Sequence, residues 1–167
     1  TGDKGAYVIN RDKAEPHCAI CFSEYPVNGG PPRLITSLAV FLTVDEPPFR
    51  PIELAAGDSN FALTLHGYFF LDAGRSRIEG LESAISPNPP GDEPALRFEW
   101  NTRLFQEGTL PLLLPALQQF IQDAGLSTEK IQALTGALAQ SELVTNPMYR
   151  AGVCRPDQWV YCVKPDG

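Results

Sequence analysis

The chain has 167 residues, of which 43% are hydrophobic, enough to fill one core or one core with a small appendage. Thirteen basic and twenty acidic residues give a formal net charge of −7, which argues against nucleic acid as a general partner. No apolar run approaches the roughly 20 residues needed to cross a bilayer, and no secretory signal opens the chain. We therefore expect a soluble protein, and cysteines expected to be reduced fit a cytoplasmic one. The opening Thr1-Gly2 in place of Met predicts a segment cut from a longer protein.

The first half of the chain is predicted to be mostly sheet. Strands are expected where β-branched and aromatic residues gather between prolines and glycines, at residues 7–10, 18–25 and 34–44. After a Pro-rich loop comes an alternating apolar ribbon over residues 61–72. One face of the ribbon is predicted to be core, and it carries Leu63, Leu65, Gly67, Phe69 and Leu71.

The second half is predicted to be helical. Prolines crowd residues 86–94 and predict a surface loop or hinge, after which apolar residues recur at helical spacing. Asn101 is the expected cap at the helix start and Gly125 the expected stop. Pro111 and Pro115 are expected to kink or divide this helix.

A second helix is expected after the cap Ser127, from residue 128 to about 141, and residues 159–163 are strand-like. Strands followed by helices predict an α+β fold, a mixed β-sheet with helices packed on one face. We expect residues 1–125 to form the main domain. Residues 126–167 would then add a helix and a terminal strand, either to the same core or as a small subdomain.

Four cysteines raise the question of a zinc site. Cys18 and Cys21 would form one half, but residues three apart in a strand point to opposite faces. Cys154 and Cys162 would form the other half, but seven residues separate them. We predict no metal site, and expect small buried side chains in place of zinc ligands or a disulfide.

Histidine occurs only at His17 and His66, so a nucleophile-histidine-carboxylate triad has few ways to form. Motifs of self-contained enzymes, such as GxSxG, a phosphate-binding glycine loop or HExxH, are also missing. His66 lies in the ribbon beside Tyr68, and is expected to be a structural histidine hydrogen-bonded beneath a helix.

Arg75 and Arg77 follow the ribbon directly, beside Asp72 and Gly74, and are close enough in sequence to address one anionic group. Guanidinium groups bind phosphate through paired donors, and a fixed position at a strand end suits phosphoryl chemistry. The alternative is a solvated turn with a surface pair between Asp72 and Arg75, worth under ~1 kcal/mol.

Two segments, HGYFFLDAGRSRI at 66–78 and FEWNTRLFQEGTLPLLLPALQQFI at 98–121, resemble the region that follows the nucleotide-binding domain in sacsin-like proteins. These proteins and their bacterial relatives belong to the GHKL superfamily of gyrases, heat-shock chaperones and histidine kinases. In that family a His-Gly-x-Phe-Phe-Leu-Asp strand runs into a basic pair, and a Trp-Asn helix start precedes a leucine-rich helix containing proline. The resemblance covers roughly residues 7–121. It departs from the family where Arg75-Ser76-Arg77 replaces adjacent basic residues.

The resemblance implies a transducer-like or middle domain that packs against an upstream nucleotide-binding domain of the same protein. That neighbour would bind most of the ATP and Mg²⁺, and a basic residue of this domain would reach the nucleotide phosphate. Arg75 is the first candidate for this catalytic and cofactor contact, Arg77 is the second, and His66 is a further cofactor contact. Hydrolysis of ATP by these residues alone is not expected.

A second function remains open, a stand-alone protein interaction module without a nucleotide role. It would use the Pro-rich loops and an aromatic face formed by Tyr68 and Phe70. In either case a protein client is a candidate partner, whereas nucleic acid and membrane are not.

Overall fold

The computed structural model describes residues 16–44, 49–81 and 92–153. The strands expected at 7–10 and 159–163 lie outside these ranges, as do Cys154, Cys162 and most of the Pro-rich segment at 86–94.

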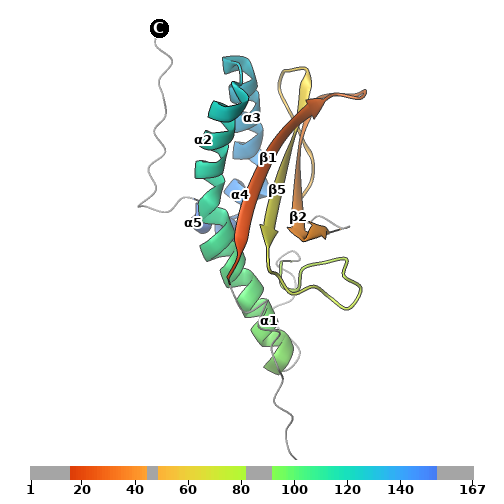
Figure 1. The fold of residues 1–167 in the computed structure, drawn as a ribbon, viewed down its shortest axis with the longest axis vertical. Helices are drawn as coiled ribbons and strands as arrows, with labels where there is room; N and C mark the ends of the chain where they lie inside the picture. The colour runs from red at the N-terminus through yellow and green to blue at the C-terminus, as the bar shows by residue number, and fades with distance from the viewer. Residues whose placement is uncertain (1–15, 45–48, 82–91, 154–167) are drawn as a thin grey trace, which may run out of the picture.

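The described residues form a mixed sheet in which the central strand has both an antiparallel and a parallel neighbour. The strand order is β1-β5-β2-β3, and β4 also pairs with β2. The strands are β1 (Cys18–Pro26), β2 (Arg33–Val40), β3 (Leu42–Thr43), β4 (Ile52–Glu53) and β5 (Ser59–Gly67). Because β5 runs antiparallel to β1 and parallel to β2, the start of β1 and the ends of β2 and β5 meet at one end of the sheet (Figure 1).

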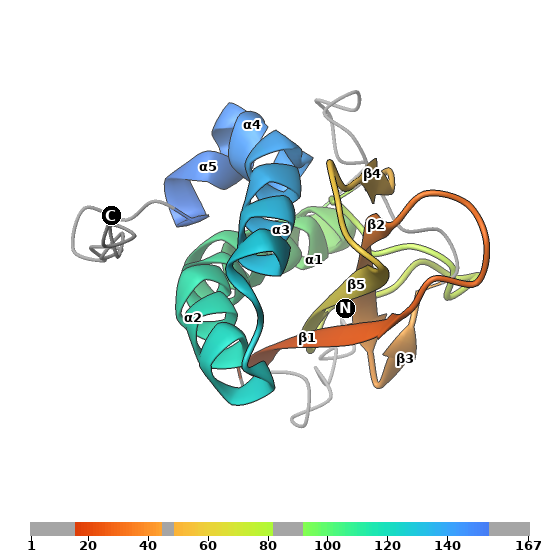
Figure 2. The same ribbon diagram turned by 90° about the horizontal axis from the view of Figure 1, so that it is seen from above.

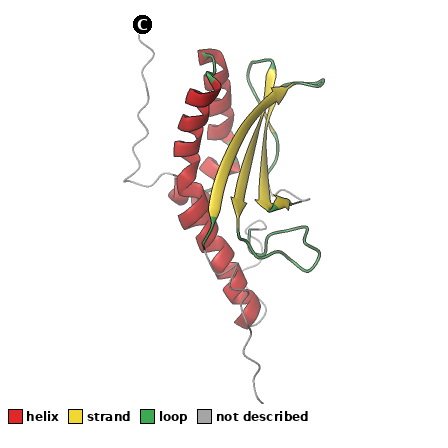
Figure 3. Cartoon of the chain, in the orientation of Figure 1, coloured by secondary structure: helices red, strands yellow, loops and turns green. Residues whose placement is uncertain are grey.

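Helices cover one face of this sheet, as predicted. They are α1 (Asp92–Arg103), the π-helical η2 (Leu104–Thr109), the 3₁₀ turn η3 (Leu110–Leu112), α2 (Leu113–Ala124), α3 (Thr128–Gln140), α4 (Glu142–Thr145) and α5 (Pro147–Val153). Figure 3 shows the segment from α1 to α2 as one long rod beside the strands, and Figure 2 shows α3 on the same side of the sheet. The α+β fold with helices on one face is therefore confirmed.

The alternation along β5 explains which face the helices cover. Phe61, Leu63 and Leu65 are fully buried, and the residues between them are partly exposed. The parallel register places Leu34 beside Phe61 and Leu38 beside Leu65, so the core face continues across β2. The opposite face of the sheet carries the intervening residues, and no described helix covers it.

The core extends from the sheet into the C-terminal helices. A single hydrophobic cluster joins β5 to Phe105 of the long rod, to Leu134 of α3 and to Leu143 of α4. The boundary expected at residue 125 stays a prediction, but the described helices beyond it pack on the same core as the sheet. None of the described helices has the combination of length and apolar character that a bilayer crossing requires.

The helix boundaries correct the prediction for Asn101 and confirm those for Pro111, Gly125 and Ser127, whereas α2 continues through Pro115. Asn101 is not a cap, because α1 begins at Asp92 and accommodates Pro94 in its first turn, where a missing N–H costs nothing. The rod is divided around Pro111 by the π and 3₁₀ turns, as expected. Gly125 ends α2 with a left-handed φ of 59°, and the Ser127 side chain accepts a hydrogen bond from the N–H of Lys130.

Two predicted strands are shorter in the structure. The segment predicted over 34–44 reverses at Phe41, where β2 turns back into β3. The ribbon predicted over 61–72 stops being a strand at Gly67, because Gly67 pairs with Cys18, the first residue of β1. Buried and partly exposed residues continue to alternate as far as Phe69, so the apolar pattern extends beyond the last residue of β5.

Candidate functional site

The predicted site residues lie at the end of the sheet where β2 and β5 end. Tyr68 and the segment up to Leu81 leave the end of β5, the β2–β3 reversal leaves the end of β2, and His17 enters β1 there. Figure 1 shows these segments at the lower end of the sheet, above α1. This end therefore presents two loops, which we call the arginine turn (residues 72–77) and the hairpin tip (Phe41 and Leu42).

Asp72 organises the arginine turn. Its carboxylate accepts hydrogen bonds from the N–H of Ser76 at 2.8 Å, the N–H of Arg77 at 3.0 Å and the hydroxyl of Ser76 at 3.2 Å. Backbone bonds from the N–H of Asp72 to the Arg77 carbonyl and from the N–H of Arg75 to the Asp72 carbonyl close the turn. The Arg77 N–H, followed by the Ser76 donors, holds the pKa of the Asp72 carboxyl below its ordinary value.

Arg75 and Arg77 are both exposed on this turn. Arg75 has a left-handed φ of 57°, a conformation that costs a non-glycine residue on the order of 1–3 kcal/mol and persists only where the surroundings impose it. Within the described residues, no ion pair or side-chain hydrogen bond engages the Arg75 guanidinium. The Asp72–Arg75 surface pair is thus replaced by bonds from Asp72 to the backbone and to Ser76.

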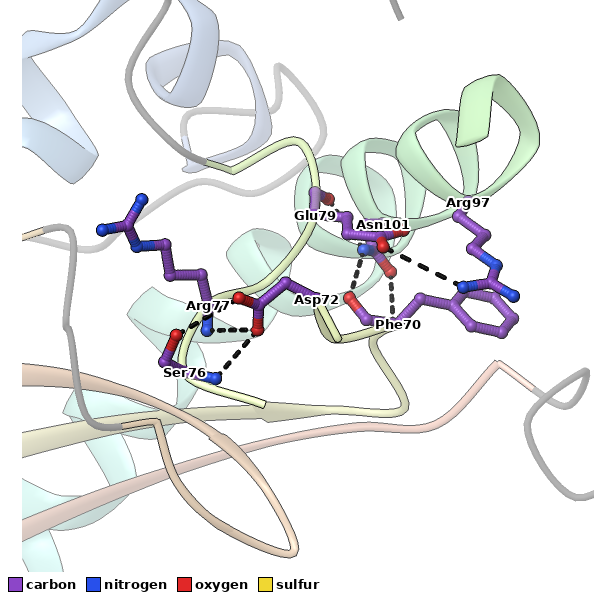
Figure 4. Close-up of polar contacts among 7 residues, drawn as sticks. All are labelled: Phe70, Asp72, Ser76, Arg77, Glu79, Arg97 and Asn101. Carbon is purple, nitrogen blue, oxygen red and sulfur yellow. Dashed lines mark hydrogen bonds and ion pairs between the residues drawn. The ribbon is translucent and has the colours of Figure 1, made fainter. Parts of the chain in front are cut away.

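The base of the turn is fixed to α1 by Asn101, which is completely buried. Its side-chain amide accepts from the Phe70 N–H at 2.8 Å and donates to the carbonyls of Phe70 at 2.8 Å and Glu79 at 2.7 Å (Figure 4). Three hydrogen bonds keep the buried Asn101 amide in one rotamer. Through the same bonds, Asn101 fixes the two ends of the loop, at Phe70 and at Glu79. The resulting segment is anchored at its base by Asn101 and at its tip by Asp72.

Aromatic and cationic contacts add to this anchoring. The Phe70 ring packs edge-on against Trp100 at 6.4 Å between centroids, and the Arg97 guanidinium lies 5.5 Å from the Phe70 ring centre. Arg97 also approaches the Glu79 carboxylate at 3.9 Å. Trp100 donates its indole N–H to the Tyr68 carbonyl at 3.2 Å. The loop from Tyr68 to Glu79 is thus attached to one helix near both of its ends.

The structure corrects the predicted position of the two arginines relative to β5. They do not follow a strand directly, since β5 ends at Gly67 and Arg75 lies within a separate turn that the isolated Leu71–Ile78 bridge flanks. The physical reason is that Asp72 and Asn101 bond to the backbone and replace the ladder as the source of rigidity. Both candidates are still brought together on one exposed turn.

His66 lies on the sheet face opposite the helices, so the expectation that it lies beneath a helix is wrong. Its ring contacts those of His17, Phe41 and Tyr68 at centroid distances of 5.5, 6.2 and 6.0 Å, and these four residues form what we call the aromatic cluster. Tyr68 lies 4.7 Å from His17 and 5.4 Å from Phe41. A role for His66 in cofactor contact stays a prediction.

The predicted aromatic face of Tyr68 and Phe70 is divided in the structure. Tyr68 belongs to the aromatic cluster, whereas Phe70 packs against Trp100 on α1. The exposed apolar surface at this end lies instead at the hairpin tip, where Phe41 is 72% and Leu42 is 80% exposed.

The structure bears on the two cysteines of β1, and it confirms that they lie on opposite faces of the strand. Cys18 and Cys21 point to opposite faces, with Cys18 near the Leu104 carbonyl at 3.7 Å and Cys21 exposed. The expectation of burial is therefore wrong for Cys21, because the face it occupies is not covered by a described helix. In the described ranges no group of His, Cys, Asp and Glu is arranged to hold a metal ion.

Sequence reasoning missed two residues of this site. Asn101 was assigned to a helix start, although its place between the apolar residues Trp100 and Leu104 is a signal for a polar group on the buried side of a helix. Phe41 carries no such signal, because the apolar run around it predicts an uninterrupted strand.

Comparison of the chain with protein-family models, curated proteins and solved structures found no match.

Proposed function

We propose that this chain is a transducer-like coupling domain of a sacsin-like or chaperone-like GHKL ATPase. In this role Arg75, with Arg77 as the second candidate, contacts the phosphate of an ATP–Mg²⁺ complex held mainly by a neighbouring domain. The guanidinium would stabilise phosphate charge when the two domains close.

The construction of the arginine turn is the observation that carries the proposal. An arginine that meets a phosphate must be positioned before the phosphate arrives, since side-chain ordering otherwise weakens the contact. Asn101 and Asp72 position the backbone on both sides of Arg75 through hydrogen bonds, and the guanidinium extends from this fixed backbone into solvent.

The test is steady-state ATP turnover in a protein that carries this segment together with its nucleotide-binding domain. We expect Arg75→Ala to lower turnover tenfold or more, about 1.4 kcal/mol of transition-state stabilisation. Arg75→Lys keeps the charge but loses the paired donors, so we expect a partial loss. Arg77→Ala measures the contribution of the second candidate.

Arg103→Ala is the matched control. Arg103 is an exposed arginine of α1, and it pairs with Glu99 on its own helix at 2.8 Å. Its loss should leave turnover unchanged. If Arg75→Ala and Arg103→Ala behave alike, with circular dichroism showing intact folds, the proposal fails.

The exposed hairpin tip supports a second candidate, a protein interaction module without a nucleotide role. Phe41 and Leu42 together present an apolar surface at the same end of the sheet. This alternative predicts that neither arginine variant affects turnover. It also predicts that Phe41→Ser weakens partner binding, whereas Leu96→Ser, at an exposed leucine of α1, does not.

A further inference from the structure

The hairpin tip is held to the sheet by a histidine. The N–H of Phe41 donates to Nε2 of His66 at 3.3 Å. Phe41 has a left-handed φ of 65°, which is rare for a bulky side chain, and its ring is largely in solvent. The burial of its own side chain therefore contributes little to holding this conformation, and the bond to His66 is a specific polar restraint on it.

This hydrogen bond fixes the protonation state of the imidazole. An acceptor nitrogen carries no proton, so neutral His66 must carry its proton on Nδ1. Nδ1 is buried, and no group among the described residues forms a hydrogen bond with it. A second proton on Nε2 would turn the acceptor into a donor that faces the Phe41 N–H, and the bond would be lost.

The neighbours of His66 include a second histidine. His17 approaches from the segment before β1, and Tyr68 follows on β5's own continuation. Cys21 lies further along β1 on the same face, while β2 places Ala39 beside His66. Within the described ranges no carboxylate forms an ion pair with either histidine. Burial, followed by the charge of His17, lowers the pKa of His66 from its ordinary value of 6.5.

We propose that His66 is a proton-operated latch for the hairpin tip. With His66 neutral, the Phe41 N–H is bound and the tip lies against the aromatic cluster. Protonation at Nε2 breaks this bond and frees the hairpin tip to move away from the rings of His17, His66 and Tyr68. The latch thus controls the position of the most exposed apolar surface in the described part of the chain.

The direction of the pH response follows from the lowered pKa. The folded state disfavours the imidazolium, so the bond is intact above the ordinary value of 6.5 and is lost as the pH falls through the folded-state pKa. The carboxylate of Asp72 keeps its charge in that range because its pKa is also lowered, so the arginine turn should not respond.

The test is a pH titration of the ¹⁵N-labelled chain by nuclear magnetic resonance between about pH 8 and about pH 5, where histidines titrate. Ring nitrogen shifts report the protonation of His66, and the amide shift and hydrogen-exchange protection of Phe41 report the tip. We expect both Phe41 signals to change at the His66 midpoint, with protection falling about three- to tenfold, as for one lost hydrogen bond. The amides of Leu63 and Leu65 in β5 should not change.

Two variants separate the latch from other pH effects. His66→Gln keeps a side-chain acceptor but cannot titrate, so Phe41 protection should become independent of pH. His17→Gln removes the neighbouring charge, so the shared midpoint should rise while the two signals stay coupled. A Phe41 amide that shows no midpoint, or that follows His17, overturns the proposal. The wild-type and His17→Gln titrations decide this even if His66→Gln does not fold.

Discussion

The arginine turn and the hairpin tip both follow the ends of parallel strands, yet they are anchored by different groups. The turn is held by an amide and a carboxylate, through three hydrogen bonds each. The tip is held by the pairing of β2 with β3, by ring contacts of Phe41 and by one side-chain hydrogen bond, to an imidazole. Amides do not titrate and carboxylates titrate far below neutral pH, whereas imidazole changes charge near it. One end of the sheet therefore combines a loop of fixed geometry with a loop that protons can release.

Among the substitutions that test this difference in anchoring, removal of the Asn101 side chain is expected to have the largest effect on stability. Asn101→Ala leaves the N–H of Phe70 and the carbonyls of Phe70 and Glu79 without their buried partner. We expect the free energy of unfolding to fall by about 2–4 kcal/mol, as for other buried groups that lose their partners. Urea unfolding followed by circular dichroism measures it.

Asn60→Ala is the control for this prediction. The Asn60 side chain also bridges two backbone groups, the Arg33 N–H and the Pro26 carbonyl, but at an exposed site where water can replace it. We expect a loss under about 1 kcal/mol. Equal losses for Asn60 and Asn101 would mean that the turn is not anchored through α1.

A smaller effect is expected from the charge of Asp72. Its folded-state pKa lies below the ordinary value of 3.8, so its contribution to stability is present above that value and is lost as the pH falls through the folded-state pKa. Asp72→Asn should therefore flatten the acid side of the stability curve, measured by urea unfolding at neutral pH and near pH 3.

Ser76→Ala tests the same region without touching the carboxylate. It removes one of the donors to Asp72, the hydroxyl at 3.2 Å, and keeps both backbone donors. The acid dependence should persist in this variant. A curve for Asp72→Asn that matches the wild type would show that the carboxylate does not organise the turn in solution.

The sequence predicted the elements whose signals are local. The gathering of β-branched and aromatic residues located β1, and the alternation of apolar residues located β5. Ser127 and Gly125 located helix ends, because burial and capping depend on neighbours along the chain. The same reasoning placed the two arginines close together, although directly after a strand and not on the separate turn that carries them. It did not place the end of β5, since this depends on where β1 begins.

The geometry of the site depends on contacts that are distant in sequence. Asn101 bonds to Phe70 across 31 positions, and His66 bonds to Phe41 across 25. Neither pairing can be found from the residues on either side. The apolar run that contains Phe41 also predicts an extended strand, and only the pairing of β2 with β3 reveals a reversal there.

The smallest expected effect concerns the backbone of the hairpin tip. Phe41→Gly and Phe41→Ala both remove a ring that is already 72% exposed, but only glycine adopts a φ of 65° without strain. We therefore expect the glycine variant to be more stable than the alanine variant by about 0.5–1 kcal/mol, measured by urea unfolding at neutral pH. The usual order is the reverse, because glycine loses more conformational entropy on folding. If alanine is the more stable, the tip is not left-handed in solution and His66 has no strained conformation to hold.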